Sequence, residues 1–402
     1  DPDQLVGKGW KRLHENKPFD AKTIFEKTAE SRKPNIRAAA LRGISAVERF
    51  VGNGGADAEK VFQSFSLDTD TTMLEAAWMD VLSFGRSGVG SNMKIGYKVL
   101  ESLTRSPGTR HAERHTLYAF RMLNDGKPEK ARRVIDDLGL VRSFRMIGPF
   151  ENISGSGYEI PYPPEKELRF DTSYTGKNNN TVEWHTLRNE VPNGWVFAQN
   201  SYGDRNAVIY YHSNVHSPNE RAATLAFGAS AAFKVYLNGS PVLADSIFRN
   251  TGADTYMQTV TLLEGDNRLL IKLCFESTPG NFLVRFTDTL GRKMEDLEYS
   301  NRRGNYKENP AVFVDLVNTP NIDRLVGELR SRIAKDPTNL EYPVALMEVY
   351  NGQELTDEAQ SLAREYLKKW PKSALWHGLY AEALRRGSKL TDAATALRTA
   401  YR

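Results

Sequence analysis

The stretch Phe233-Lys-Val-Tyr-Leu-Asn-Gly-Ser-Pro-Val-Leu243 decides the fold of the central part of the chain. Phe233, Val235 and Leu237 alternate with polar or amphipathic residues, which places one set of side chains on a core face. Asn238-Gly239 supplies the two positive-φ positions of a tight hairpin turn. The stretch therefore predicts two antiparallel β-strands joined by a two-residue turn.

Five further segments around this hairpin have strand-like patterns. Apolar and β-branched residues predominate in these segments, and Gly, Asn and Pro, which favour turns, lie between them. Short strands at this spacing indicate a β-sandwich of two sheets. Together with the first strand of the hairpin, the expected strands cover residues 207–212, 221–227, 233–238, 258–263, 269–275 and 283–287.

Helical patterns precede and follow the β region. Residues 3–140 divide into helix-turn-helix pairs that recur every 35 to 40 residues, which is the signature of a solenoid. A second set of helices starts at Asp336-Pro337. Within it Trp370-Pro371 ends one helix, because proline disfavours helical geometry in the residue before it. Small residues at the expected close-approach positions allow tight helix packing: Gly43, Ala46, Ala77, Ala119 and Ala131.

Length and composition indicate a folded protein of several domains. A chain of 402 residues is too long for one ordinary core. Its 40% apolar and 26% charged residues exclude a disordered chain. No apolar run approaches the length that a membrane-spanning helix needs. We expect a helical repeat solenoid over 1–142, a β-sandwich over 143–290, a crossing segment over 291–320 and helical repeats over 321–402.

The net charge of +4 is mild and unevenly spread. Residues 1–143 contain 24 Lys or Arg against 19 Asp or Glu, and the remainder contains 30 against 31. Such a surplus favours a solvated face, with an acidic partner or surface as the alternative. Nothing resembles an RNA-recognition or helix-turn-helix signature, so nucleic acid is not expected as a partner.

Cys274 is the single cysteine of the chain, so no disulfide can form within it. It lies in the apolar run 269–275, where a thiol behaves as a small hydrophobe. A catalytic cysteine would need an activating base and access to solvent. We therefore expect Cys274 to be buried and structural.

A series of motifs runs through residues 143–290. It consists of Ile147-Gly-Pro-Phe150, Tyr162-Pro-Pro-Glu165, Gly176-Lys177, Trp184, Leu237-Asn-Gly239, and Gly265-Asp-Asn267 followed by Leu270-Ile-Lys272. This series resembles the galactose-binding-like jelly rolls, which are carbohydrate-binding-like modules appended to bacterial glycosidases and other envelope enzymes. The flanking helices resemble tetratricopeptide repeats. The whole order is similar to the N-terminal half of bacterial envelope proteins that continue into a transglutaminase-like domain, and it implies a periplasmic or secreted location.

Sugar binding by such a module would use exposed aromatic rings beside polar groups. Trp195, Tyr202, Tyr210 and Tyr211 lie in or beside the loop 193–206 and are the candidate ligand-binding residues. The alternative for Trp195 is packing in the core or at its rim, because a buried aromatic ring removes a large apolar area from water.

A bound metal has little support in the sequence. Related modules often carry an acidic pair in the loop before the Asn-Gly hairpin, and here that segment reads Gly228-Ala-Ser-Ala231. Calcium needs several oxygen ligands. Asp245, Asp254 and Asp266 could be neighbours, but the sequence alone does not bring them together. We therefore expect no cofactor, with calcium as the alternative.

No catalytic constellation emerges from the motifs. His111 and His115 have i, i+4 spacing on an expected helix, but no glutamate completes a His-Glu-x-x-His pattern and no third ligand is evident. We expect a non-enzymatic scaffold of the bacterial envelope that binds protein partners through its helical repeats. The alternatives are a carbohydrate-binding protein that binds a glycan through the jelly roll, and the regulatory N-terminal part of a transglutaminase-like or other envelope enzyme.

Overall fold

A computed structural model describes most of the chain as two compact units. The described residues are 2–52, 60–61, 63–65, 67–70, 72–77, 79, 111–187, 193–198, 205–276, 280–306, 322–353 and 355–400. One unit, here called the helical unit, contains Asp1–Gly108 together with Asp323–Arg402. The other, the β unit, is Thr109–Ile322. The β unit is therefore an insertion in the chain of the helical unit, whereas sequence alone led us to expect four consecutive segments.

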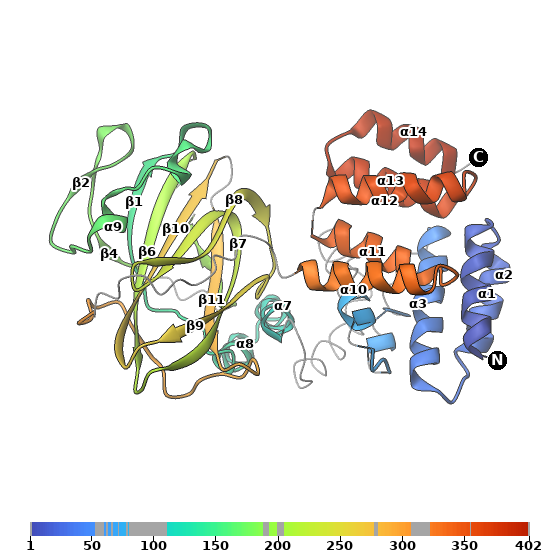
Figure 1. Cartoon of the computed structure of the whole chain (residues 1–402), viewed down its shortest axis with the longest axis horizontal. Coiled ribbons are helices and arrows are strands. Elements are labelled where there is room, and N and C mark those ends of the chain that lie inside the picture. The colour runs from blue at the N-terminus through green and yellow to red at the C-terminus, as the bar shows by residue number, and fades with distance from the viewer. Residues whose placement is uncertain are drawn as a thin grey trace. The chain divides into compact units, whose positions relative to one another are not determined.

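The helical unit combines helices from both ends of the chain. In Figure 1 the N-terminal helices are blue and the C-terminal helices are orange to red. No described helix is both long enough and apolar enough to cross a lipid bilayer. The helices of this unit whose bounds the structure describes are α1 (Pro2–His14), α2 (Pro18–Thr28), α3 (Pro34–Phe50), α10 (Ile322–Lys335), α11 (Glu341–Gly352), α12 (Thr356–Lys369), α13 (Ala374–Arg386) and α14 (Leu390–Ala400).

Phe25 packs the first three helices together. Its ring is fully buried on α2. A Cβ atom added to Gly9 on α1 or to Gly43 on α3 would lie 2.5 Å from this ring. Both glycines are therefore required for the close approach, because real Cβ atoms do not come so near. The expected close-approach role of Gly43 is confirmed.

The β unit is built on one curled antiparallel sheet of ten strands (Figure 1). The hydrogen-bonded order is β4-β1-β6-β10-β7-β11-β5, while β8 and β9 also pair with β7 and β12 pairs with β6. A separate ribbon joins β2 (Tyr174–Thr175) to β3 (Thr181–Val182). The strands of the large sheet are β1 (Arg145–Glu151), β4 (His185–Thr186), β5 (Val196–Phe197), β6 (Ala207–Ser217), β7 (Arg221–Leu237), β8 (Ser240–Asn250), β9 (Tyr256–Leu262), β10 (Gly265–Phe275), β11 (Asn281–Thr287) and β12 (Glu298–Ser300).

Strand β7 makes the sheet continuous. It has 17 residues; its first half pairs with β9 and β11, and its second half pairs with β8 and β10. The segment Gly228–Ala231, expected as a loop, is the middle of this strand. A Cβ atom on Gly228 would lie 2.1 Å from the carbonyl oxygen of Gly252, so the backbones approach closely there.

The Asn-Gly hairpin is confirmed. Asn238 and Gly239 have φ angles of 52° and 89°, and they join β7 to β8. Both values lie in the left-handed region that a two-residue hairpin turn requires.

The prediction of a two-sheet jelly-roll sandwich between two separate solenoids is wrong. The described strands of the β region form one large curled sheet rather than two packed sheets. Residues 221–227 and 233–238 were expected as two strands, but they are the ends of β7. Helical regions are present at both ends of the chain as expected, and they belong to one compact unit.

The two faces of the sheet are buried in different ways. Inside the curl, residues such as Phe144, Tyr211, Phe227 and Phe233 form the main core. The outer face of β6 and β10 is covered by the segment between β1 and β4. This segment contains the short helices η1 (Ile153–Tyr158), α9 (Pro163–Lys166) and η2 (Lys177–Asn179). Cys274 is buried in this outer cluster, and burial raises the pKa of its thiol to about 12.

Helices α7 (His111–Asn124) and α8 (Pro128–Asp136) also belong to the β unit. The backbone N–H of Ala112 on α7 donates to Asp254, whose carboxylate forms a buried pair with Arg285 of β11. The guanidinium of Arg285 also donates to the carbonyl of Leu138. These polar contacts attach the helix pair to the sheet.

Candidate functional site

A cavity of about 410 Å³ lies in the helical unit. Side chains from α3, α11, α13 and α14 line it, so it exists only because the two ends of the chain come together. Its apolar wall includes Phe50, Val344, Leu375, Leu379 and Leu397. An apolar cavity of this size with a few polar groups is the usual form of a ligand or side-chain pocket. We take it as the candidate site.

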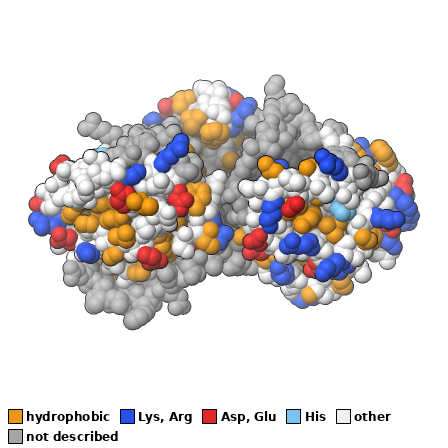
Figure 2. Space-filling model, turned by 90° about the horizontal axis from the view of Figure 1, so that it is seen from above, with side chains coloured by type: hydrophobic (Ala, Val, Ile, Leu, Met, Phe, Trp, Pro, Cys, Tyr) orange, Lys and Arg blue, Asp and Glu red, His pale blue; other side chains and the backbone are white. Residues whose placement is uncertain are grey.

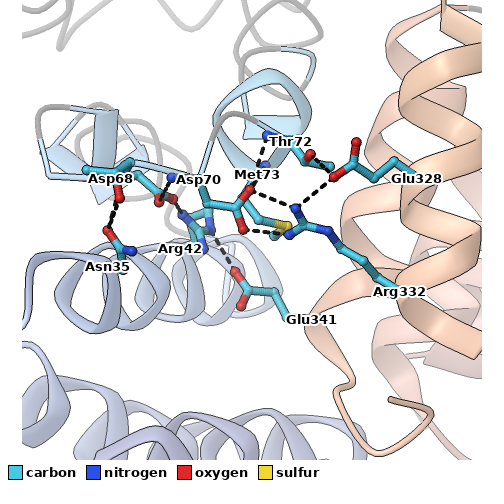
Figure 3. A network of polar contacts seen from close by, with 10 residues as sticks. Asn35, Arg42, Asp68, Asp70, Thr72, Met73, Glu328, Arg332 and Glu341 are labelled. Atoms are coloured by element: carbon cyan, nitrogen blue, oxygen red, sulfur yellow. Dashed lines mark hydrogen bonds and ion pairs between the residues drawn. The ribbon is translucent and has the colours of Figure 1, made fainter. Parts of the chain in front are cut away.

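Arg42 joins the N-terminal to the C-terminal helices (Figure 3). Its guanidinium donates to Glu341 at 2.6 Å and also pairs with Asp68. All three side chains are largely buried. Burial raises the pKa of Glu341, while the positive charge of Arg42 opposes that shift. A second, smaller cavity of about 50 Å³ adjoins Arg42 and Glu341.

A second set of contacts joins α10 to the N-terminal segment. Arg332 donates to both oxygens of Asp70, at 2.5 and 3.1 Å, and also to Glu328 at 3.0 Å. The hydroxyl of Thr72 donates to the same Glu328 carboxylate at 2.7 Å (Figure 3). Although burial alone would raise the pKa of Asp70, Arg332 holds it below its usual value. Bidentate arginine–carboxylate pairs fix geometry as well as charge, so these contacts hold α10 against the N-terminal segment.

Charged side chains form the polar part of the cavity lining. Glu382 accepts hydrogen bonds from two neighbouring guanidinium groups: from Arg385 at 2.7 and 2.8 Å, and from Arg386 at 2.7 Å. Arg386 also donates to the backbone carbonyl of Asn351 at 3.0 Å. Arg49 pairs with Glu348 across α3 and α11.

The side chain of Asn351 is the unsatisfied polar group of the cavity. It is 2% exposed, and its Oδ1 atom has no hydrogen-bond partner among the described residues. A buried polar atom without a partner costs about 1–3 kcal/mol. Neighbouring atoms cover this oxygen, so it lies behind the cavity surface and is not itself a contact point for a ligand.

The aromatic residues expected to bind sugar do not form one exposed surface. Trp195 is half-buried beside β5, and Tyr202 lies outside the described residues. Tyr210 and Tyr211 on β6 are fully buried on opposite faces of the sheet. A fully buried ring cannot serve as a sugar platform, so neither tyrosine is proposed for that role.

Lys272 and Glu165 are the centre of a buried polar network on the outer face of the sheet. The ammonium of Lys272 donates to Glu165 at 2.8 Å and to the carbonyls of Tyr158 and Ile160 at 2.9 and 2.8 Å. The hydroxyls of Tyr210 and Tyr236 also donate to Glu165. Because its carboxylate and ammonium are well partnered, this network fastens the covering segment to the sheet.

The three candidate calcium ligands have different protein partners. Asp245 accepts from Arg249 and Tyr256, Asp254 pairs with Arg285, and Asp266 accepts from Asn214, His216 and the backbone of Asn305. In the described part of the chain, no three or more His, Cys, Asp and Glu side chains are grouped as a metal site would require. His115 lies on α7 and is buried.

Sequence reasoning missed the cavity residues. The Glu382-x-x-Arg385-Arg386 spacing is a local signal, because residues three and four apart face each other on a helix. Asn351 and Arg49 carry no such signal, since their positions depend on contacts between segments about 300 residues apart.

Comparison with known proteins identifies no family. No protein-family model and no curated protein sequence matches the chain. The chain is similar to two solved structures of a β-glucosidase from Kluyveromyces marxianus, each at 8% identity. The selenomethionine-labelled form has a TM-score of 0.22, with 52% of this chain and 21% of that chain covered. The glucose complex has a TM-score of 0.24, with 54% and 25% covered. The matches thus span a quarter or less of the β-glucosidase, and scores this low carry no argument about function.

Proposed function

We propose that this chain is a non-enzymatic binding protein whose helical unit holds a protein partner. An apolar side chain of the partner would enter the cavity between α3, α11, α13 and α14. The observation that carries this proposal is the apolar cavity that α3, α11, α13 and α14 form from the two ends of the chain. The bacterial envelope as its location remains a prediction from the resemblance.

The chemistry of the cavity favours a peptide segment as the occupant. Protein interfaces gain most of their affinity where an anchor side chain fills a desolvated pocket. The apolar wall, which includes Phe50, Leu375 and Leu379, suits such an anchor. The buried pair of Arg42 and Glu341 keeps α3 and α11 in place before binding, which lowers the entropy lost on association.

A pocket-filling substitution tests the proposal. Gly378 on α13 lines the cavity, and a Cβ atom added there meets nothing within 4 Å. Gly378→Leu should occupy the cavity while raising helix propensity by up to about 1 kcal/mol. Gly7→Leu is the matched control, because Gly7 is also helical, half-buried and open around its Cβ, but lies on α1 outside the cavity lining.

The measurement is selection of a displayed random-peptide library on the intact protein. We expect enriched peptides with an apolar anchor that bind the wild type and the Gly7→Leu variant equally. They should bind the Gly378→Leu variant at least tenfold more weakly. If no peptide is enriched, or if the enriched peptides bind the Gly378→Leu variant unchanged, the cavity is not the partner site and the proposal fails.

A further inference from the structure

We infer that the partner segment carries an acidic residue next to its apolar anchor, and that Arg385 recognises this acid. This inference rests on the proposed function and specifies the chemistry of the partner. It is carried by the arrangement of Glu382, Arg385 and Arg386 in the cavity lining.

Glu382 holds two guanidinium groups with one carboxylate. Arg385 contributes its Nε and Nη2 atoms to this contact, and Arg386 contributes its Nε atom. The three side chains therefore keep a net charge of +1 beside the apolar wall. Because both arginines are fixed by hydrogen bonds, little side-chain entropy remains to be lost when an anion binds them.

Arg385 is the member that a partner can reach. Its side chain is 56% exposed, whereas that of Arg386 is 13% exposed and is also bound to the carbonyl of Asn351. Among the described residues, Arg385 donates to Glu382 alone. A guanidinium carries five N–H donors, so Arg385 retains donors for a second carboxylate.

The surrounding helices strengthen the preference for an anion. Residues 356–400, which comprise α12 to α14, contain eight Lys or Arg and five Asp or Glu. This segment is therefore locally basic, with a surplus of three, although residues 144–402 as a whole contain 30 Lys or Arg against 31 Asp or Glu. Lys and Arg side chains are frequent around the apolar patches of the helical unit, at the right of Figure 2. A positive rim steers acidic segments toward the site and disfavours basic ones.

A charge-reversal experiment tests the inference with the library peptides. The strongest cavity-dependent peptide is synthesised with its Asp or Glu intact and as the matched Asn or Gln form. We expect the acidic form to bind wild type about fivefold more tightly, as a charge-assisted contact at a partly exposed site should. Arg385→Glu should remove or reverse that preference. Arg398→Glu is the control, because Arg398 is an exposed residue of α14 outside the cavity lining.

The outcomes separate this inference from the proposed function. One outcome would overturn the inference and leave the cavity as the binding site. In it, the peptides bind the Gly378→Leu variant more weakly, but they are not enriched in acidic residues and bind the Arg385→Glu variant as tightly as wild type. If no peptide is enriched, or if the enriched peptides bind the Gly378→Leu variant unchanged, both the proposed function and this inference fail. Displacement of the peptide by a single-stranded oligonucleotide at equal charge concentration would also overturn the inference, because the arginines would then select any polyanion. Arg385→Gln keeps the result interpretable if the charge reversal destabilises α13.

Discussion

His14 on α1 is a buried histidine where the two ends of the chain meet. Its ring lies 5.5 Å from that of Trp370 and 6.0 Å from that of Trp376, measured between centroids. The Nδ1 atom lies 2.9 Å from the carbonyl of Trp10, and Nε2 has no partner within the described part of the chain. Burial lowers the pKa of His14 to about 4. A protonated imidazole would place an uncompensated charge among these aromatic rings.

We therefore expect acid to destabilise the helical unit through His14. The unfolded chain takes up the proton near pH 6.5, whereas the folded chain resists it down to about pH 4. The stability that neutral His14 contributes to the folded state is complete above pH 6.5 and is lost as the pH falls toward 4. The loss is on the order of 3 kcal/mol. Urea unfolding at pH 7 and pH 4.5, followed by circular dichroism at 222 nm, should show a smaller difference for His14→Gln than for wild type. His377→Gln, a partly exposed histidine of the same unit, should leave the difference unchanged.

Lys272 and Lys234 lie opposite each other on neighbouring strands but have different surroundings. Lys272 is fully buried in the Glu165 network. Lys234 pairs at 3.2 Å with Glu159, whose side chain is 80% exposed. Breaking a buried charge pair leaves an uncompensated charge, whereas an exposed pair contributes little.

Lys272→Met should lower the free energy of unfolding of the β unit by about 3 kcal/mol. The Lys234 ammonium also lies 4.3 Å from the centroid of the Tyr158 ring. Lys234→Met should lower the free energy of unfolding by less than about 1 kcal/mol, the value of a partly exposed pair with a cation–π contact. Chemical denaturation followed by circular dichroism of the sheet measures both. Equal losses in the two variants would show that the network around Glu165 does not fasten the covering segment as described.

The first N–H group of helix α13 is capped by a side chain far away in the sequence. The backbone N–H of Ala374 donates to the Asn16 side chain at 2.8 Å, and that side chain donates to the carbonyl of Lys372 at 2.6 Å. Asn16 follows α1 and has a φ angle of 60°. It therefore combines a turn conformation that asparagine tolerates with a capping function that normally comes from the preceding residue.

Two substitutions separate these roles. Asn16→Gly keeps the positive φ angle and removes the cap, so we expect a loss of about 1 kcal/mol in the free energy of unfolding. Asn16→Ala adds the strain of a left-handed backbone and should cost roughly another 1 kcal/mol. Urea titration of the helical signal gives both values. If the glycine variant is as stable as wild type, the contact to α13 contributes nothing.

The elements that sequence predicted well are those with local signals. The Asn-Gly turn, the burial of Cys274 and the C-terminal helices all depend on spacing within a few residues, and each was found. Strand β7 was divided in two because Gly228–Ala231 consists of small residues that also favour loops. Its continuity depends on pairing with four other strands, which no local pattern records.

Nothing in the sequence indicates that the helices at the two ends of the chain form one unit. Arg42 pairs with Glu341 and Asp70 pairs with Arg332, yet each pair spans more than 250 residues. The spacing of polar residues shows which face of a helix is polar, but it does not show which distant residue that face pairs with. The candidate cavity was missed for the same reason, because α3 supplies one wall and α11, α13 and α14 supply the others.

The insertion has a consequence for how the protein is made on the ribosome. Helices α1 to α3 emerge early, but the segments that complete their core follow only after the whole stretch Thr109–Ile322. At common translation rates this interval lasts roughly 10 to 40 seconds. The β unit is contiguous and can fold as it leaves the exit tunnel. The first helices must meanwhile expose the apolar faces that later meet α11 and α13, which makes the nascent N-terminal segment a natural client for chaperones.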